Sequence, residues 1–411
     1  MSAAAAVDEV FAKILDPRNR ANPYPLYAEL RRTPVARLAD GGYVVSTYTE
    51  IAALLHDPRL SSDLTNLPEG AAAPEEEAET AAQLPPSFIR LDPPDHDRLR
   101  RLTMRHFGPP HTPDRVDGMQ PQLREITDRL VDGFTDRDRV DLVDDFAYPF
   151  PVTVICALLG VPREDEPRFH TWADAIIETI DPATGDLAGR QRRRDRARAE
   201  LADYLNGLVE ARRHEPGDDL LSALATDAGP MSQQDLLSTA VTLLLAGHET
   251  TVNLIANGML TLLRHREVLE RLRREPALVI RLTEELLRYE PPVHYIPSRV
   301  ALDDIEIAGT IIARGSQVAL VLAAGNRDPV RVRDPERFDP DREDIEHFGF
   351  GGGIHYCFGA PLARVETYLA LTELARRLDN PRLATDPPPY RPNSVLRGPR
   401  HLLVDIDGVR A

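Results

Sequence analysis

The most constraining feature of the sequence is a cysteine set among glycines directly before a helical pattern. Residues 350–361 read Phe-Gly-Gly-Gly-Ile-His-Tyr-Cys-Phe-Gly-Ala-Pro, and the cysteine is Cys357. Glycine permits positive φ and a close approach of the backbone to a flat ligand. A cysteine beside a helix N-terminus meets the positive end of the dipole and free N–H groups, and both favour the thiolate. We therefore predict that Cys357 is a nucleophile or a metal ligand, with an ordinary loop cysteine as the alternative.

The rest of the chain predicts a mainly helical protein with a minor β part. Apolar positions recur at helical spacing over residues 115–134, 191–213, 231–265, 266–289 and 360–378. Alternating patterns predict a hairpin of residues 35–38 and 43–46, and a second small sheet of residues 299–308, 311–312 and 317–322. We expect one domain over residues 1–411, β-rich at about 20–65 and 299–325.

Composition excludes several classes of protein. Cys156 and Cys357 are the only two cysteines in 411 residues, which excludes a disulfide-stapled fold and a cysteine-rich metal site, and Cys156 in an apolar run is expected in the core. The net charge of −17 disfavours nucleic acid, and the arginine-rich run 190–198 favours a solvated helix face. No apolar run approaches the ~18 residues of a membrane span, and a signal peptide is not recognisable. We expect a soluble, cytoplasmic monomer without a membrane anchor.

The spacing Phe350-x-x-Gly353-x-x-x-Cys357-x-Gly359 resembles the haem-binding loop of the cytochrome P450 monooxygenases. The resemblance implies a mainly α fold with small antiparallel sheets, in which haem b (heme b, iron protoporphyrin IX) lies between helix 231–265 and this loop. It makes Cys357 the proximal thiolate ligand of the iron, which favours cleavage of the O–O bond. The loop residues implied to bind the cofactor are Phe350, Gly351, His355, Cys357 and Gly359.

Helix 231–265 contains the segment Ala-Gly-His-Glu-Thr-Thr at 246–251. A glycine inside a helix costs ~1 kcal/mol relative to alanine, and the Thr250 hydroxyl can bond to the carbonyl four residues back. A helix with a tolerated glycine is the alternative. A zinc motif is excluded, because Val252 stands where a second histidine is required. The segment resembles the family's distal signature, which implies that Thr250 and Glu249 deliver protons to dioxygen and that Ala246 and Gly247 border the haem.

A pair of residues near the end of pattern 266–289 has two interpretations. Taken alone, Glu285 and Arg288 at i,i+3 predict an exposed salt bridge of roughly 0.3–0.5 kcal/mol. The resemblance implies instead a structural network that supports the haem loop from behind, with Arg337 as its third member.

Haem propionates need cationic or hydrogen-bonding partners, because buried unpaired carboxylates are costly. His96 and Arg100 share one helix face at i,i+4 spacing. The resemblance places these two residues, Arg299 and His355 at the propionates.

The resemblance also implies an apolar substrate pocket and oxidation of hydrophobic natural products such as macrolides and other polyketides, terpenoids or steroids. The implied pocket residues are Phe88, Leu243, Ala246, Val293, Ile296 and Leu396. The Ala- and Glu-rich segment 69–82 predicts a solvated loop, with a mobile lid as the alternative.

The sequence lacks the Gly-x-Gly-x-x-Gly fingerprint of a nicotinamide or flavin module, so a separate ferredoxin and ferredoxin reductase are expected to supply electrons for O2. The residues expected to form a basic docking patch are Arg98, Arg101, Arg105 and Arg364. Three alternatives stay open: a peroxide-driven peroxygenase, a non-catalytic haem sensor and a cysteine hydrolase. The Glu249–Thr250 pair argues against the first, and the close sequence position of His355 to Cys357 argues against the third.

Overall fold

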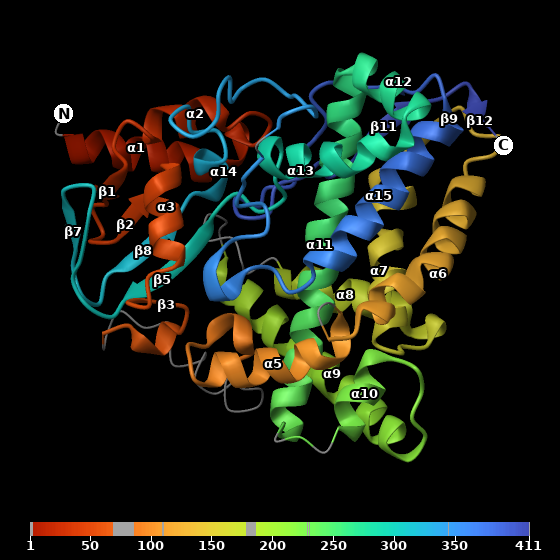
Figure 1. The fold of residues 1–411 in the computed structure, drawn as a ribbon, viewed down its shortest axis with the longest axis horizontal. Coiled ribbons are helices and arrows are strands. Elements are labelled where there is room, and N and C mark those ends of the chain that lie inside the picture. Colours follow the sequence, from red (N-terminus) through yellow and green to blue (C-terminus); the bar gives the residue numbers. More distant parts are fainter. Residues whose placement is uncertain are drawn as a thin grey trace.

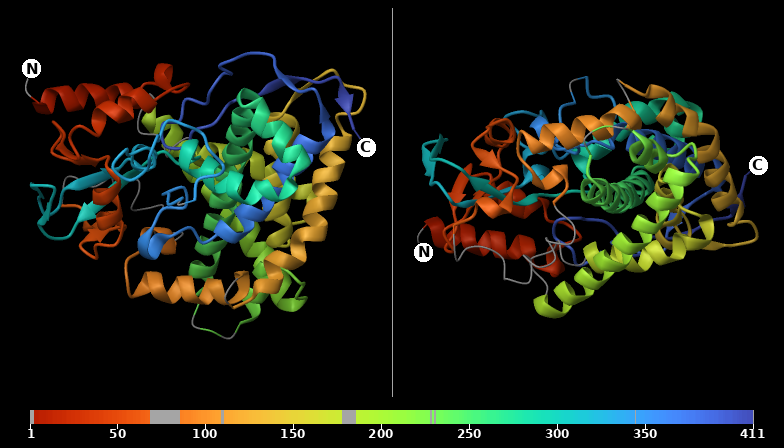
Figure 2. Two further views of the ribbon diagram at one scale, coloured as in Figure 1. Left: turned by 45° about the horizontal axis from the view of Figure 1, so that its top comes forward. Right: turned by 90° about the horizontal axis from the view of Figure 1, so that it is seen from below.

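A long central helix organises the molecule. The computed structural model describes residues 3–68, 86–108, 111–177, 186–227, 229, 231–343 and 345–410. Helix α11 (Gln233–Arg264) begins with a capping box of Ser232 and Asp235, which satisfies free N–H groups of its first turn. Seen almost end-on in Figure 2, α11 is enclosed by other helices, and α7 (Pro149–Leu158), α9 (Leu187–His214) and α15 (Ala360–Arg377) pack against it.

Four of the five predicted helices are confirmed within a few residues, and one prediction is wrong. The predicted helix 266–289 is two helices, α12 (Arg266–Arg274) and α13 (Val279–Tyr289), with Pro276 between them. Proline lacks an N–H and its ring clashes with the preceding turn, so it ends the helix. The other helices are α1 (Ala3–Leu15), α2 (Tyr24–Leu30), α3 (Tyr48–Leu55), α5 (Asp95–Phe107), α6 (Pro113–Asp132), α8 (Glu166–Ile177), α10 (Leu220–Thr226) and α14 (Leu322–Gly325).

The β part is divided between two ends of the molecule, and its largest sheet lies to one side of the long helices (Figure 1). Its five-stranded sheet has the order β1-β2-β8-β5-β3. The strands are β1 (Val35–Arg37), β2 (Tyr43–Val45), β3 (Leu60–Ser61), β5 (Ile296–Ala301) and β8 (Gln317–Leu320). The predicted hairpin is confirmed, with Val35 opposite Val45.

The predicted second sheet is wrong in its pairing. Strand β8 pairs parallel with β2, so β5 and β8 join the hairpin's own sheet, and all other pairs in that sheet are antiparallel. Val45 and Val318 are both buried in one apolar cluster, and this shared burial holds the distant segments together. Only β6 (Ile305–Ile307) and β7 (Thr310–Ile312) form a separate hairpin. The short remaining strands are β4 (Arg139–Asp141), β9 (Leu378–Asp379), β10 (Arg382–Leu383), β11 (Leu403–Asp405) and β12 (Gly408–Val409).

Among the helices of the described ranges, none carries an apolar stretch long enough to cross a bilayer. The cysteine loop leads directly into α15, which runs beside α11 (Figure 1). The fold therefore brings residues 246–251 and residues 350–361 into two neighbouring elements of the core.

Candidate functional site

The cysteine loop is folded by its own backbone hydrogen bonds. The Cys357 N–H donates to the Phe350 carbonyl at 2.9 Å, which closes the loop. Gly353 has φ +62°, and a Cβ atom there would lie 1.9 Å from the Leu55 carbonyl oxygen of α3. The expected positive φ is present, and glycine at 353 is also required by the close approach of α3. Gly351 also has a positive φ, of +67°.

The charge state of Cys357 is set by opposing effects. Burial raises the pKa of the Cys357 thiol, whereas the amides of Gly359 and Ala360 and the guanidiniums of Arg100 and Arg364 lower it. The amides at the helix N-terminus favour the thiolate, as expected, but burial is the larger effect and leaves the pKa above its ordinary value. A coordinated metal ion deprotonates a thiol outright, and the amides aimed at the sulfur then stabilise the anion.

Two histidines with unpartnered ring nitrogens lie beside this loop. His96 of α5 is 1% exposed and its Nδ1 lies 2.8 Å from Asp97 Oδ1, and its ring centroid is 4.6 Å from that of His355. His355 Nε2 is bonded to Ser62 Oγ at 2.7 Å. Within the described ranges, His96 Nε2 and His355 Nδ1 are buried without a hydrogen-bond partner. Buried polar atoms are rarely left unpaired, so the two nitrogens indicate a polar ligand.

Two arginines complete this group. Burial lowers the pKa of Arg299 to about 10, and the Arg299 side chain donates to the Ser298 carbonyl at 3.1 Å. No carboxylate in the described part of the chain forms an ion pair with Arg299. Arg100 donates to the Tyr356 carbonyl at 2.6 Å. Burial, then Arg299, His96 and Arg100, lower the pKa of His355 to about 3, so it is a neutral hydrogen-bonding group.

The four residues predicted at the propionates are thus gathered beside Cys357. They supply two half-buried guanidiniums that form no ion pair within the described residues, and two buried ring nitrogens without hydrogen-bond partners. Such a set complements two carboxylates. The donor set fits the expected haem. The Nε2 atom of His355 is hydrogen-bonded to Ser62 Oγ rather than to Cys357, which leaves the hydrolase alternative without a catalytic base.

Removal of the Arg299 charge is expected to weaken retention of the haem. A charge-assisted hydrogen bond contributes about 1.5–3 kcal/mol, so Arg299→Gln is expected to speed haem transfer to apomyoglobin roughly tenfold to a hundredfold. Arg59→Gln is the control, because Arg59 pairs with Asp57 at the surface. Equal transfer rates in the two variants would contradict the assignment of Arg299.

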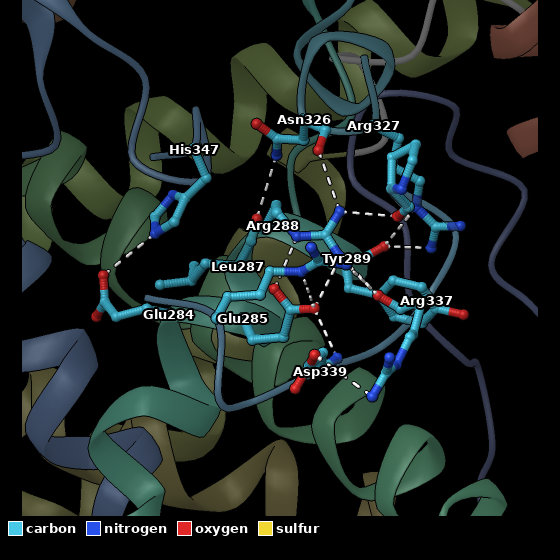
Figure 3. Close-up of polar contacts among 12 residues, drawn as sticks. Glu284, Glu285, Leu287, Arg288, Tyr289, Asn326, Arg327, Arg337, Asp339 and His347 are labelled. Atoms are coloured by element: carbon cyan, nitrogen blue, oxygen red, sulfur yellow. Dashed lines mark hydrogen bonds and ion pairs between the residues drawn. The ribbon is translucent and has the colours of Figure 1, made fainter. Parts of the chain in front are cut away.

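The predicted structural pair is buried and lies in a network of polar contacts, which Figure 3 shows. Glu285 and Arg288 of α13 are fully buried and joined by two hydrogen bonds of 2.7 Å. Arg288 also donates to the carbonyls of Asn326, Pro335 and Arg337. Asn326 Oδ1 accepts the Phe348 N–H at 2.7 Å, two residues before the loop. The interpretation as an exposed salt bridge is therefore wrong.

The third member of the network differs from the prediction. Arg337 contributes its carbonyl, while its side chain is 70% exposed and lies 3.6 Å from Asp339. The guanidinium that reaches Glu285 belongs to Arg342, with Nε 3.2 Å from Oε1. The two arginines lie five residues apart, and no pattern in this one sequence distinguishes them. Only the path of the chain decides which one turns inward.

The middle of α11 has an open face and a closed face. Ala246 is exposed and Thr250 half-buried although the helix is central, so this face opens onto interior space. The Thr250 hydroxyl donates to the Ala246 carbonyl at 2.9 Å, as predicted. On the closed face, a Cβ at Gly247 would lie 2.9 Å from Ile155 of α7. Gly247 therefore permits close helix packing.

Glu249 lies on the closed side, 3% exposed. It forms an ion pair with Arg391, a residue of the C-terminal segment that the sequence did not single out. Asn253 Nδ2 donates to the same carboxylate at 3.4 Å.

The predicted pocket residues divide into two groups. Val293 and Ile296 are half-buried, Leu243 and Leu396 are buried, and Val293 pairs with Leu396 in a β-bridge. Phe88 is 2% exposed and its ring packs on Phe358, 5.7 Å between centroids. Phe88 is therefore a core residue beside the cysteine loop, which corrects its assignment to the pocket. The segment predicted as a solvated loop or a lid, residues 69–82, lies outside the described residues.

The predicted basic patch is largely paired. Arg98 contacts Asp95 and Asp235, and Arg105 contacts Asp227. Arg364 is bound by Glu284 through two hydrogen bonds of 2.7 and 2.9 Å, and Arg101 is exposed. Cys156 is fully buried in α7, and burial raises the pKa of its thiol to about 12, as expected for a core residue.

Known proteins resemble this chain both in sequence and in fold. The profile of the family described as "Cytochrome P450" matches residues 64–405. The chain is 41% identical over 396 residues to cytochrome P450 monooxygenase PikC of Streptomyces venezuelae, covering 92% of this chain and 89% of that protein. It is 40% identical to 6-deoxyerythronolide B hydroxylase of Saccharopolyspora erythraea, with 94% and 96% covered. It is also 40% identical to vitamin D(3) 25-hydroxylase of Pseudonocardia autotrophica, with 92% of each covered.

Two solved structures show the same architecture. Ligand-free CYP164A2 of Mycobacterium smegmatis has a TM-score of 0.87 at 38% identity, with 97% of this chain and 100% of that chain covered. P450BioI in complex with an acyl carrier protein carrying hexadec-9Z-enoic acid has a TM-score of 0.87 at 34% identity, with 95% and 100% covered.

Proposed function

The chain belongs to the cytochrome P450 family of haem-thiolate monooxygenases, and from this premise we propose that it oxidises a hydrophobic natural product. The substrate classes that we propose are macrolides and other polyketides, terpenoids and steroids, and the reaction is hydroxylation or epoxidation. Relatives named for 6-deoxyerythronolide B and vitamin D(3) support these classes. The observation that carries the proposal is the open face of α11 at Ala246 and Thr250, backed by the buried Glu249.

We assign haem b to the space between α11 and the cysteine loop. Cys357 would hold the iron, and His96, Arg100, Arg299 and His355 would bind the propionates. When bound, haem b supplies the activation of dioxygen and the electron transfer. The chain supplies the thiolate ligand, cationic and hydrogen-bonding groups for the propionates, and a position for the substrate.

The chain's own contribution to proton delivery lies on α11. Thr250 Oγ1 is held by its hydrogen bond to the Ala246 carbonyl, so the hydroxyl stays at the open face. Its oxygen can still accept a hydrogen bond there, and its single O–H can rotate away from the Ala246 carbonyl to donate a proton at the open face. Glu249, the next residue, is the acidic group behind it. Together these two side chains can move protons to the open face of α11.

Replacement of the Thr250 hydroxyl is expected to separate electron use from product formation. In Thr250→Ala, product per electron pair is expected to fall by at least roughly tenfold, within what a positioned proton donor contributes, while electron consumption continues. Product and NADH consumption are measured together. Thr251→Ala is the matched control, because the Thr251 hydroxyl is buried and bonds to the Gly247 carbonyl. Unchanged coupling in Thr250→Ala would mean that another route delivers the protons.

The substrate class is tested by spectroscopy of the holoenzyme. Members of each proposed class are titrated, the shift of the haem spin state is recorded, and products are identified by mass spectrometry. We expect tight shifts for large apolar compounds, because Leu243, Val293, Ile296 and Leu396 offer apolar surface. Shifts confined to small polar compounds would contradict the proposal.

We assign the electron supply to a ferredoxin and a ferredoxin reductase that dock near Arg101, on the side of α5 and the cysteine loop. The test compares turnover with these partners against turnover with hydrogen peroxide alone. Turnover that requires the partners supports the proposal. Efficient turnover with peroxide alone would favour the peroxygenase.

A further inference from the structure

We propose that Arg391 is a positioning residue for Glu249, and that it makes proton delivery depend on the segment that also forms a substrate wall. The inference rests on the proposed role of Glu249. It concerns the contact between α11 and residues 390–399, where Glu249 and Arg391 meet although they are 142 positions apart in the sequence.

The two oxygens of the Glu249 carboxylate have different surroundings. Oε1 accepts from Arg391 Nη1 and, at 3.4 Å, from Asn253 Nδ2. Oε2 is buried and has no hydrogen-bond partner in the described part of the protein. His248 Nε2 lies 3.9 Å from Oε2, beyond hydrogen-bond distance. Arg391 therefore anchors the carboxylate by one oxygen and leaves the other available to hold and release a proton.

The position of Arg391 is itself fixed by the helix it contacts. The Arg391 N–H donates to the Gly398 carbonyl at 3.2 Å, which ties the two arms of segment 390–399 together. A Cβ at Gly398 would lie 2.0 Å from Asn253 Oδ1, so only glycine lets the backbone come this close to α11. Asn257 Nδ2 donates to the Arg397 carbonyl at 3.0 Å one turn further along. The Arg391 guanidinium is therefore held in place by segment 390–399, which packs directly on α11.

The same segment carries Leu396, which we assign to the substrate pocket and which pairs with Val293. A ligand that displaces Leu396 acts on the backbone that holds Arg391. Without the cation, a buried carboxylate would keep a single long contact from Asn253, and such a group is costly. The carboxylate would turn toward another partner, and Oε2 would leave the position that its contact with Arg391 now fixes.

The test compares holoenzymes by the amount of product formed per NADH and by the substrate dissociation constant from the spin-state shift. In Arg391→Gln, product per NADH is expected to fall to the level of Glu249→Gln, at least about threefold below wild type, with the dissociation constant unchanged. The double variant, which combines Arg391→Gln with Glu249→Gln, is expected to form as much product per NADH as Glu249→Gln alone. Arg391→Lys keeps the charge but reaches one bond less far, so an intermediate value is expected.

Arg264→Gln and Arg264→Lys are the matched controls. Arg264 joins α11 to the C-terminal region through an ion pair with Asp386. Its replacement therefore removes an ion pair between the same two parts of the chain, but one that does not involve Glu249. These controls are expected to keep wild-type coupling.

A second readout does not use activity. The free energy of unfolding is measured for both single variants and the double variant, and the double loss is expected to be smaller than the sum of the single losses. If the losses in the free energy of unfolding were additive, the two side chains would not be energetically coupled, and the proposal would be refuted.

The outcomes separate the two proposals. If Glu249→Gln uncouples turnover and Arg391→Gln does not, the role of Arg391 is wrong and that of Glu249 stands. If Glu249→Gln leaves coupling unchanged, the proposed proton delivery by Glu249 is wrong. Should Arg391→Gln fail to load haem, Arg391→Lys decides: coupling below that of Arg264→Lys supports the proposal, and equal coupling overturns it.

Discussion

Replacing Cys357 by Ser is expected to abolish monooxygenation while leaving the fold intact. A serine hydroxyl offers far less electron density to iron than a thiolate, and the push that favours O–O cleavage is lost. The Gly359 and Ala360 amides that face the sulfur would still hold the loop. The measurement is the absorption spectrum of the reduced protein under carbon monoxide, together with product formation. The strongly red-shifted Soret band is expected in wild type and absent in the variant.

Cys156→Ala is the control for this experiment. Cys156 is fully buried in α7, so its loss removes a thiol and leaves a small cavity. Its stability is expected to fall, while the Soret band stays at the wild-type position. Hydroxylation retained by Cys357→Ser would refute the assignment of the iron ligand.

The second large effect is expected at Glu285. Its carboxylate accepts from Arg288, Arg342 and the Asp339 N–H, all in a buried setting. Removing one partner of a buried ion pair costs about 3–5 kcal/mol, because the remaining charge is left uncompensated. Glu285→Gln is therefore expected to lower the free energy of unfolding by about this amount and to reduce haem content, since the network also holds the segment before the cysteine loop.

Two arginine variants make this prediction sharper. Arg342→Gln is expected to destabilise the protein, because its guanidinium reaches Glu285. Arg337→Gln is expected to stay within about 0.5 kcal/mol of wild type, since its side chain is largely exposed. Urea unfolding of the Glu285, Arg342 and Arg337 variants measures how much free energy of unfolding each one loses. A loss in Arg337→Gln as large as that in Glu285→Gln would restore the sequence-based assignment.

The candidate site was predictable where a local pattern carries the chemistry. The spacing around Cys357 and the Thr250 bond to the carbonyl of Ala246 both depend on neighbours within a few residues. The gathering of His96, His355 and Arg299 was predictable only through the family resemblance, because these residues come from three distant segments. Arg391 was missed altogether, since no local signal marks an arginine in a C-terminal loop as the partner of Glu249.

The sequence by itself determined four of the long helices to within a few residues, the cysteine loop and the family. Helical periodicity, caps and proline breaks depend on hydrogen bonds and burial within a few turns, so they can be read locally. Pro276 belongs to this class, although the predicted helix 266–289 passed over it.

Only the tertiary structure decided which distant groups meet. It paired β2 with β8, placed Phe88 against Phe358, turned Arg342 rather than Arg337 toward Glu285, and brought Arg391 to Glu249. These choices depend on burial and charge compensation summed over the whole core, where one buried partner excludes another. The residue types are written in the sequence, but their partners are selected by packing.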